Sequence, residues 1–572
     1  MRRAALNALP AALVPLALAW VVAGQGVALP VWLATATVAV IGVLAGLTLI
    51  EGVTWHAALS WLAGLVGWAA LAAAVRPVAP APAAWTVAIG VVAFAVALVA
   101  STPRGGAWAA ATVVTAGAAG AGWLIAEWLT VAARPAGPFG NPNQAATVPL
   151  LALAFLPWLR LPVAARVALA VPLVAGVLAS GSRGGLLGLL ALGLAWGFAA
   201  SGPRLRRAAV VAALVAAVVL ALRLATDRDP LRFERLRIWR AAATAAVAEL
   251  PLGAGPSGFV DAVLPHNFPR VGEAARYHRI PGVAESDYLE LATTLGLPGL
   301  ALALGLAVAV MRRLHGARAL GVAAALAVTS AVNTQLVVPV VAWLATLALA
   351  AVLRRPHGRP LRVGPVLAAA LLLAVGVPAA IALRWPAGGL GEDPAALIAR
   401  AEAAWAAKPA DPALADAEAF AWRATRLAPR SGKAWRALAS VRLERARQRG
   451  DADLARGAAA TFAEAQRVNP LDAWAALGQG QAHRLVGEAT ASRAALEAAV
   501  RLEPNFVPAW LELALLGLEQ GDLARARHAL GRAEAARRDR IPAAFVSDYE
   551  RALLAADPAL VHRLRAAVGV ER

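Results

Sequence analysis

The stretch "GVAESDYLELATTLGLPGL" (Gly282 to Leu300) carries three carboxylates and then runs into a long apolar segment. A helix of about 20 apolar residues crosses the roughly 30 Å hydrocarbon core of a bilayer. The stretch therefore predicts a transmembrane helix whose entrance is marked by Glu285, Asp287 and Glu290. An acidic edge beside a membrane segment is also a first candidate for a functional site.

The composition extends the membrane prediction to most of the chain. Of the 572 residues, 60% are hydrophobic and only 15% are charged, and the mean hydropathy is +0.64, far from the values of soluble domains. The chain has no cysteine, which excludes disulfides and thiolate metal sites. We therefore expect a polytopic membrane protein.

The net charge of +20 does not indicate nucleic acid binding. Residues 1–385 carry 28 Lys and Arg against 11 Asp and Glu, which leaves 26 of the 54 basic and 23 of the 34 acidic residues for 386–572. The basic excess thus belongs to the apolar part, where cytoplasmic loops are expected to carry it. No nucleic-acid partner is predicted.

Thirteen apolar runs approach the length of a membrane span, and the first is read as an uncleaved helix because so many follow it. The expected spans are 4–23, 29–49, 54–75, 83–101, 107–132, 144–159, 162–181, 185–201, 208–222, 289–311, 317–333, 336–353 and 363–384. With the N-terminus inside, arginines gather in the inner loops, and the short outer loops hold only Arg76, Arg134 and Arg183. Residues 386–572 then lie on the outer face.

One predicted outer loop, at about 223–288, collects the acidic residues. Nine of the 11 carboxylates of residues 1–385 lie between Asp227 and Glu290. A loop of this length between spans is more often functional than a spacer, although any solvated loop is also rich in charge. Within it, "FERLRIWRAAATAAVAELPLGAGPSGF" predicts a helix with Arg235 and Trp239 on one face, followed by a glycine turn.

The acidic stretch predicts the start of a second helix. Asp287 would cap it, and Glu290, three residues later, would complete a capping box. Glu285 would stand just outside the cap, near the positive end of the helix dipole, where a carboxylate can accept a proton. The alternative for Glu285 is an ordinary solvated loop acid.

Two further outer-facing motifs are candidate site elements. In "LASGSRGGLLGLL", Arg183 lies between two spans among small residues that allow phosphate oxygens to approach the backbone, and a guanidinium can grip a diphosphate through two parallel hydrogen bonds. The alternative is an arginine that extends to the membrane surface. In "GPFGNPNQAA", Asn141 and Asn143 form a turn at a helix entrance, which turn chemistry alone would explain.

In order, "GNPNQAA", "SGSRGGLLGLL", "RLRIWRAAATAAVAELPLGAGPSGF" and "ESDYLELATTLGLPGL" resemble the O-antigen ligase and O-antigen polymerase group of membrane glycosyltransferases, over about residues 85–350. The resemblance implies an enzyme of the bacterial inner membrane. It would move a glycan from an undecaprenyl diphosphate carrier to an acceptor hydroxyl on the outer face, without a metal or other cofactor. The acceptor could be a lipid A core, a growing lipid-linked chain or a protein.

The resemblance also implies residue roles. Arg183, with Leu187 four places later, and Arg235, four places before Trp239, would bind the carrier diphosphate. Apart from the resemblance, Asn141, Asn143 and Asp287 are expected in supporting roles. The family typically has a histidine eleven residues before the last glycine, and here that position, counted from Gly296, is Glu285. Glu285 would therefore act as the general base. His266 or His278 could supply the base instead, or transfer activity could be lost.

The chain changes character after Trp385. Pro429, Pro470 and Pro504 are 41 and 34 residues apart, and Trp435, Trp474 and Trp510 follow them at six, four and six residues. A 34-residue period resembles tetratricopeptide repeats, which stack into an α-solenoid. The fold prediction is thus all-α, with a membrane domain over 1–385 and a repeat domain over 386–572 on the outer side. The repeats would bind an envelope protein, with the Trp residues in the core.

Two other classes of function stay open. A transporter would carry ionisable residues within its spans, whereas here they gather in one outer loop. A non-catalytic scaffold, anchored by the spans, would need neither Arg183 nor the acidic loop.

Overall fold

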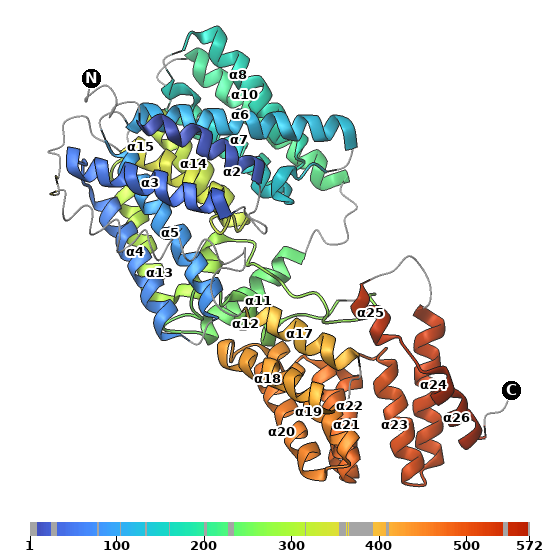
Figure 1. Cartoon of the computed structure of the whole chain (residues 1–572). Helices are drawn as coiled ribbons and strands as arrows, with labels where there is room; N and C mark the ends of the chain where they lie inside the picture. The colour runs from blue at the N-terminus through green and yellow to red at the C-terminus, as the bar shows by residue number, and fades with distance from the viewer. Residues whose placement is uncertain are drawn as a thin grey trace. The chain divides into compact units, whose positions relative to one another are not determined.

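The structure is a computed structural model, and all regular elements in the part that it describes are helices, which confirms the all-α prediction (Figure 1). Packing divides the chain into two compact units. Unit 1 comprises residues 1–76, 80–259 and 283–391, and unit 2 comprises 77–79, 260–282 and 392–572. The described residues are 9–23, 31–76, 79–102, 105–131, 134–159, 161–199, 203–226, 234–270, 272–314, 316–353, 362, 364, 393–407, 411–540 and 547–569.

Unit 1 is a bundle of apolar helices. The helices of unit 1 are α2 (Leu13–Ala23), α3 (Val31–Glu51), α4 (Ala57–Val75), α5 (Pro80–Ala100), α6 (Gly105–Val131), α7 (Pro142–Phe155), α8 (Val163–Ala179), α9 (Arg183–Ala199), α10 (Pro203–Thr226), α11 (Glu234–Ala248), α13 (Asp287–Met311), α14 (Gly316–Val332) and α15 (Pro339–Leu353). Of these, α9, α11 and α13 surround the candidate site, and α7 runs through the core.

Four described helices are long and apolar enough to cross a membrane: Ala57–Val75, Pro82–Ala100, Gly105–Thr130 and Asp287–Met311. Shorter apolar helices lie at Leu13–Val22, Ala39–Ile50, Val163–Ala179, Arg183–Phe198, Ala213–Leu222, Ala319–Val332 and Pro339–Leu353. The chain is therefore a membrane protein. The number of thirteen spans stays a prediction, and the span expected at 363–384 lies, apart from Gly364, outside the described residues.

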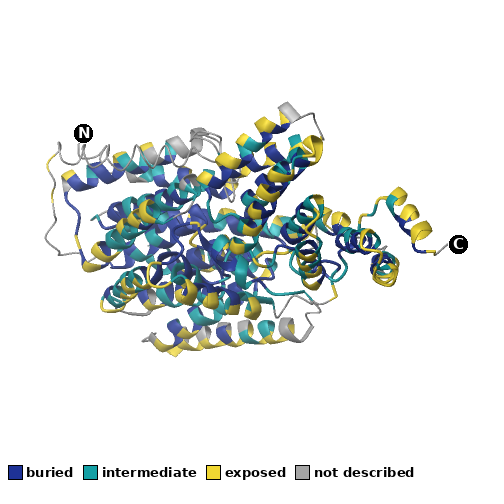
Figure 2. Ribbon diagram, turned by 90° about the horizontal axis from the view of Figure 1, so that it is seen from below, coloured by how far each residue is buried: buried dark blue, intermediate teal, exposed yellow. Residues whose placement is uncertain are grey.

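Exposed apolar side chains mark the outer faces of the bundle. On α8, Val163, Val167 and Val171 are exposed at intervals of four residues, so they form one stripe along the helix. On α10, Leu214 and Val218 form a similar stripe. In Figure 2 the buried residues concentrate inside the bundle and the exposed ones lie along its outer helices. Exposed apolar stripes of this kind suit contact with lipid tails.

Helix α7 is the central element of unit 1. Its side chains from Asn143 to Phe155 are all buried, and it packs against α6, α8, α9, α14 and α15. Because the polar start of α7 is anchored by this apolar packing, Asn143 is held at a fixed place beside the first turn of α9.

Unit 2 contains paired helices and the segment 260–282. Each helix from α17 to α24 packs on the next, and alternate helices also touch. The Trp435 and Trp510 indoles each donate to the carbonyl of the proline six residues earlier, at 2.9 Å, and all three repeat tryptophans pack against buried clusters. The bounds are α17 (Pro394–Ala406), α18 (Asp411–Leu427), α19 (Gly432–Arg449), α20 (Ala452–Val468), α21 (Ala473–Val486), α22 (Ala489–Leu502), α23 (Val507–Glu519), α24 (Leu523–Arg540), α25 (Asp548–Leu553) and α26 (Pro558–Ala567), with the short α12 (Phe259–Val263) where the two units meet in sequence.

Candidate functional site

Arg183 is the first residue of α9, and a tight turn fixes its position. Gly181 in this turn has a left-handed backbone, with φ of 61°, a conformation that glycine adopts without strain. The Ser182 hydroxyl donates to Asn143 Oδ1 at 2.8 Å. Asn141 in turn caps α7 by accepting from the Asn143 amide at 2.9 Å. The predicted turn motifs therefore lie together, and Asn143 joins the start of α7 to the turn that carries Arg183.

Arg235 and Glu285 form an ion pair. Arg235 lies in the first turn of α11, and its Nη2 is 3.1 Å from Glu285 Oε2. Trp239, one turn later on the same face, donates its indole N–H to the Glu285 carbonyl at 3.1 Å. The predicted shared face of α11 thus contacts both the side chain and the backbone of one residue.

The backbone of Glu285 is strained. Its φ is 53°, in the left-handed region that costs a residue with a Cβ about 1–3 kcal/mol. Such conformations persist only where the surrounding contacts impose them, and they concentrate at functional sites. The ion pair and the Trp239 hydrogen bond are two contacts that hold Glu285 in this conformation.

Asn333, which no sequence motif predicted, connects the parts of the site. Its Oδ1 accepts from Arg235 Nη2 at 3.3 Å, and its carbonyl accepts from the Asp287 amide at 3.2 Å. Its side-chain amide lies against Gly184, where an added Cβ would be 2.2 Å from Nδ2. The polar run Asn333–Gln335 between two apolar segments was the available signal.

Electrostatics link Arg183 to this pair. Burial lowers the pKa of Arg235, the Glu285 carboxylate opposes this effect, and the positive charge of Arg183 lowers the pKa further. The charge of Arg183 therefore acts on Arg235, and Asn333 connects the two helices, because it bonds Arg235 and lies against Gly184, the residue after Arg183. Two neighbouring cations in a partly buried place suit a ligand that carries more than one negative charge.

The predicted capping box is wrong. The N-cap of α13 is Ser286, which makes no side-chain capping bond, and Asp287 is the first helical residue. Asp287 Oδ1 instead accepts from the amides of Gln335 and Leu336, both at 3.0 Å. Glu290 Oε2 accepts from the Ala284 amide at 2.8 Å. Asp287 thus accepts from backbone amides of the segment after Asn333 instead of capping its own helix. Glu290 holds the backbone of Ala284, the residue before Glu285.

The glycine turn after α11 packs closely against the backbone of α13. Gly253 and Gly296 both have positive φ, 78° and 61°, and a Cβ on Gly253 would lie 2.5 Å from the Gly296 nitrogen. The Ala254 amide donates to the Thr293 carbonyl at 2.8 Å. Only glycine permits this approach of two backbones, and the contact fixes α11 relative to the helix that follows Glu285.

One buried polar atom of the site, Asn333 Nδ2, has no hydrogen-bond partner among the described residues, and it lies beside Gly184 at the start of α9. A buried polar group that makes no bond costs free energy, so this atom calls for an explanation. A bound ligand with an acceptor atom would satisfy it.

The two histidines considered as alternative bases belong to unit 2. His278 stacks on Tyr549 with ring centroids 5.9 Å apart, and its Nδ1 is 3.6 Å from Glu273 Oε2. His266 is partly buried at the end of a short 3₁₀ helix, Leu264–His266. The choice between Glu285 and either histidine as base stays a prediction.

Comparison with known proteins agrees with the resemblance seen in the motifs. Residues 168–304 match the sequence profile of a family described as O-antigen ligase, a range that includes Arg183, Arg235 and Glu285. Among solved structures, the chain is similar to the crystal structure of a thermophilic TPR protein in Thermus thermophilus. The identity is 22%, the coverage is 35% of this chain and 94% of that chain, and the TM-score is 0.25. No curated protein matches the chain.

Proposed function

We propose that this chain, which carries an O-antigen ligase domain over residues 168–304, transfers a glycan from an undecaprenyl diphosphate carrier to an acceptor hydroxyl at the outer face of the bacterial inner membrane. The observation that carries the proposal is the ion pair of Arg235 and Glu285 beside a membrane helix, with Asn333 linking Arg235 to the start of α9, where Arg183 lies. A scaffold would not require this arrangement.

The two arginines bind the donor diphosphate. Arg183 at the start of α9 and Arg235 on α11 supply two guanidinium groups, which suit the paired phosphates of the carrier. Their charge stabilises the leaving diphosphate as the bond to the anomeric carbon breaks. Asn143 bonds Ser182, the residue before Arg183, and Asn333 bonds Arg235, so both act as positioning residues.

Glu285 acts on the acceptor. Without donor, its carboxylate is paired with Arg235. When the diphosphate binds, it competes for Arg235 and frees the carboxylate. Glu285 then takes the proton of the acceptor hydroxyl while that oxygen bonds to the anomeric carbon and the diphosphate departs. The same ion pair thus couples donor binding to the release of the base.

The acceptor decides between ligase and polymerase activity. A ligase attaches the finished glycan to a lipid A core or a protein, and a polymerase extends a lipid-linked chain. The residues around Arg183 contact the donor, which both activities share. Residues 386–572 would lie on the outer side and recruit an envelope protein through tetratricopeptide-like repeats.

The test is transfer by purified full-length protein in lipid nanodiscs with an undecaprenyl-diphosphate glycan and candidate acceptors. Arg183→Ala should abolish transfer, and Arg166→Ala is the control, because Arg166, on α8, bonds the Leu161 carbonyl. Electrophoresis of the products distinguishes long lipid-linked chains, made by a polymerase, from glycosylated core or protein, made by a ligase. Transfer by Arg183→Ala at the parental rate would refute the proposal.

A further inference from the structure

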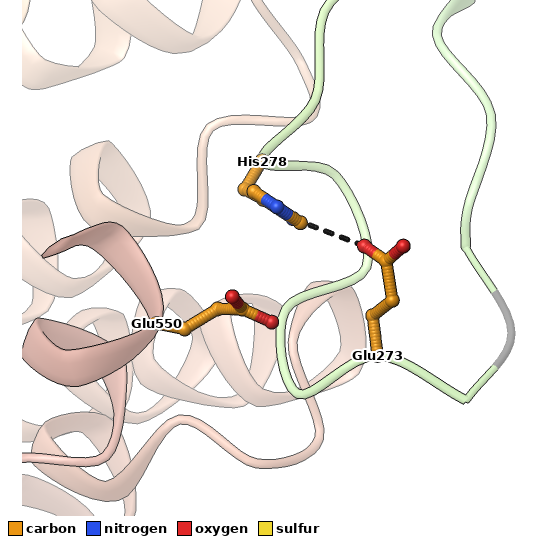
Figure 3. A group of neighbouring side chains, drawn as sticks. All are labelled: Glu273, His278 and Glu550. Carbon is orange, nitrogen blue, oxygen red and sulfur yellow. Dashed lines mark ion pairs between the residues drawn. The ribbon is translucent and has the colours of Figure 1, made fainter. Parts of the chain in front are cut away.

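Three metal-ligating side chains meet in unit 2, apart from the proposed transferase site. Glu273 and His278 come from the segment 260–282, and Glu550 comes from α25 (Figure 3). One potential ligand atom of each lies within 4.8 Å of the others. We propose that these residues bind a zinc ion, which fastens the segment to α25.

Burial makes this group unusual. The His278 side chain and Glu550 are each 8% exposed, and the Glu273 side chain is 24% exposed. Glu273 Oε2 is buried and has no hydrogen-bond partner among the described residues, and it lies 3.6 Å from His278 Nδ1. Two carboxylates held this close in a poorly hydrated place repel each other unless a cation lies between them.

The surrounding contacts hold the three side chains in place. The Ser547 hydroxyl donates to Glu550 Oε2 at 3.1 Å. The His278 ring stacks on Tyr549, the neighbour of Glu550. Its Nδ1–H donates to the Ala275 carbonyl at 3.1 Å, which leaves Nε2 as the nitrogen that would bind the metal. Ligands of structural and catalytic metals are commonly oriented by such outer contacts.

The segment itself is held independently of any cation. The Glu503 carboxylate, which is fully buried, accepts from the Arg276 amide at 2.6 Å and the Tyr277 amide at 2.9 Å. The backbone between Glu273 and His278 is therefore fixed before an ion binds. A preformed backbone lowers the entropy that is lost when the ligands are ordered around a metal.

The mixture of ligands favours zinc. One imidazole and two carboxylates match the ligand types of Zn²⁺, whereas Ca²⁺ and Mg²⁺ prefer oxygen alone. Around an ion with bonds of about 2.0–2.2 Å, the ligand atoms lie closer to one another than 4.8 Å. Zinc binding would therefore draw the three side chains slightly together. The fourth position would be left to water.

Arg279 competes with a metal ion for two of the proposed ligands, Glu273 and His278. Its Nη2 is 3.5 Å from Glu273 Oε1, and its Nε contacts His278 Nε2 at 3.4 Å. Since its side chain is about half exposed, it can turn into solvent when an ion binds. Removing its charge should therefore strengthen zinc binding.

The experiment titrates ZnCl₂ into full-length, chelator-treated protein that carries no polyhistidine tag, by isothermal calorimetry, with Co²⁺ absorption as a second readout. The parental protein should bind one equivalent of zinc. His278→Ala and Glu550→Gln should each weaken binding at least tenfold, and Arg279→Gln should strengthen it. His483→Ala is the matched control, because His483 also pairs with a glutamate, Glu488 at 2.7 Å.

Each result decides the proposal. Loss of binding in Glu273→Gln as well, with an unchanged elution volume, would support the three-ligand site. The proposal is overturned if the parental protein binds no zinc. It is also overturned if His278→Ala binds as tightly as the parent, or if His483→Ala loses the same site.

Discussion

At the scale of single residues, Glu285 combines three features: a left-handed backbone, an ion pair with Arg235 and a carbonyl held by Trp239. The sequence places a carboxylate at this position, where the family resemblance implies a histidine. It could not predict the strained backbone, because that conformation is imposed by a helix 46 residues earlier in the chain.

Glu285→Gln tests the role of the carboxylate as base. We expect kcat to fall by about 100-fold or more, the usual contribution of a general base, while membrane abundance stays unchanged. Glu249→Gln is the control, since Glu249 is also paired with an arginine, Arg76 at 2.7 Å. If Glu285→Gln keeps full activity and His266→Ala or His278→Ala loses it, the base is a histidine.

Gly184 tests the role of Asn333. Because an added Cβ would lie 2.2 Å from Asn333 Nδ2, Gly184→Ala should displace Asn333 and, through it, Arg235. Transfer should fall at least tenfold in an assay at saturating acceptor. Gly122 lies on α6, and a Cβ added there would meet no atom within 4 Å. Gly122→Ala should therefore retain activity. Equal activities of the two variants would contradict a positioning role for Asn333.

At the scale of elements, the helices of the membrane part could be anticipated from apolar runs because a bilayer requires long uninterrupted helices. The N-cap of α13 could not, since Asp287 bonds residues 48 and 49 positions later. The local capping pattern was overridden by long-range backbone donors. The same limit applies to Asn333, whose importance arises only from packing between segments distant in sequence.

The crossing of Gly253 and Gly296 yields a stability prediction. Gly253→Ala combines a positive φ with a contact of 2.5 Å to backbone atoms, so we expect the free energy of unfolding to fall by about 2 kcal/mol or more. Gly282→Ala meets no atom within 4 Å and should change it by less than about 0.5 kcal/mol. Thermal melts in detergent compare the two, and equal melting temperatures would contradict the close approach.

At the scale of the whole molecule, the sequence predicts a membrane part followed by repeats, but it does not predict that segment 260–282 packs with the repeats. Glu503 makes this contact, yet in the sequence it is one acid in a charge-balanced region. The segment ends immediately before Val283, which is only two residues from Glu285. The chain therefore passes from unit 2 into unit 1 two residues before Glu285.

Glu503→Ala tests how firmly the repeat unit holds this segment. Losing a buried carboxylate that accepts two amide hydrogen bonds should open the segment, because such bonds contribute about 1.5–3 kcal/mol each. Trypsin should then cleave after Arg276 and Arg279 at least ten times faster, as read by mass spectrometry. Glu497→Gln, whose carboxylate pairs with Arg501 on α22, should cleave at the parental rate.

The most direct measurement of the central claim is the affinity of the purified protein for undecaprenyl diphosphate, determined in nanodiscs by microscale thermophoresis. If Arg183 and Arg235 grip one diphosphate, Arg183→Ala and Arg235→Ala should each weaken binding at least tenfold, about 1.4 kcal/mol. Their combined effect should be less than additive, because both contact the same ligand. Arg76→Ala should bind like the parent. Unchanged affinity in both single variants would contradict a shared diphosphate site.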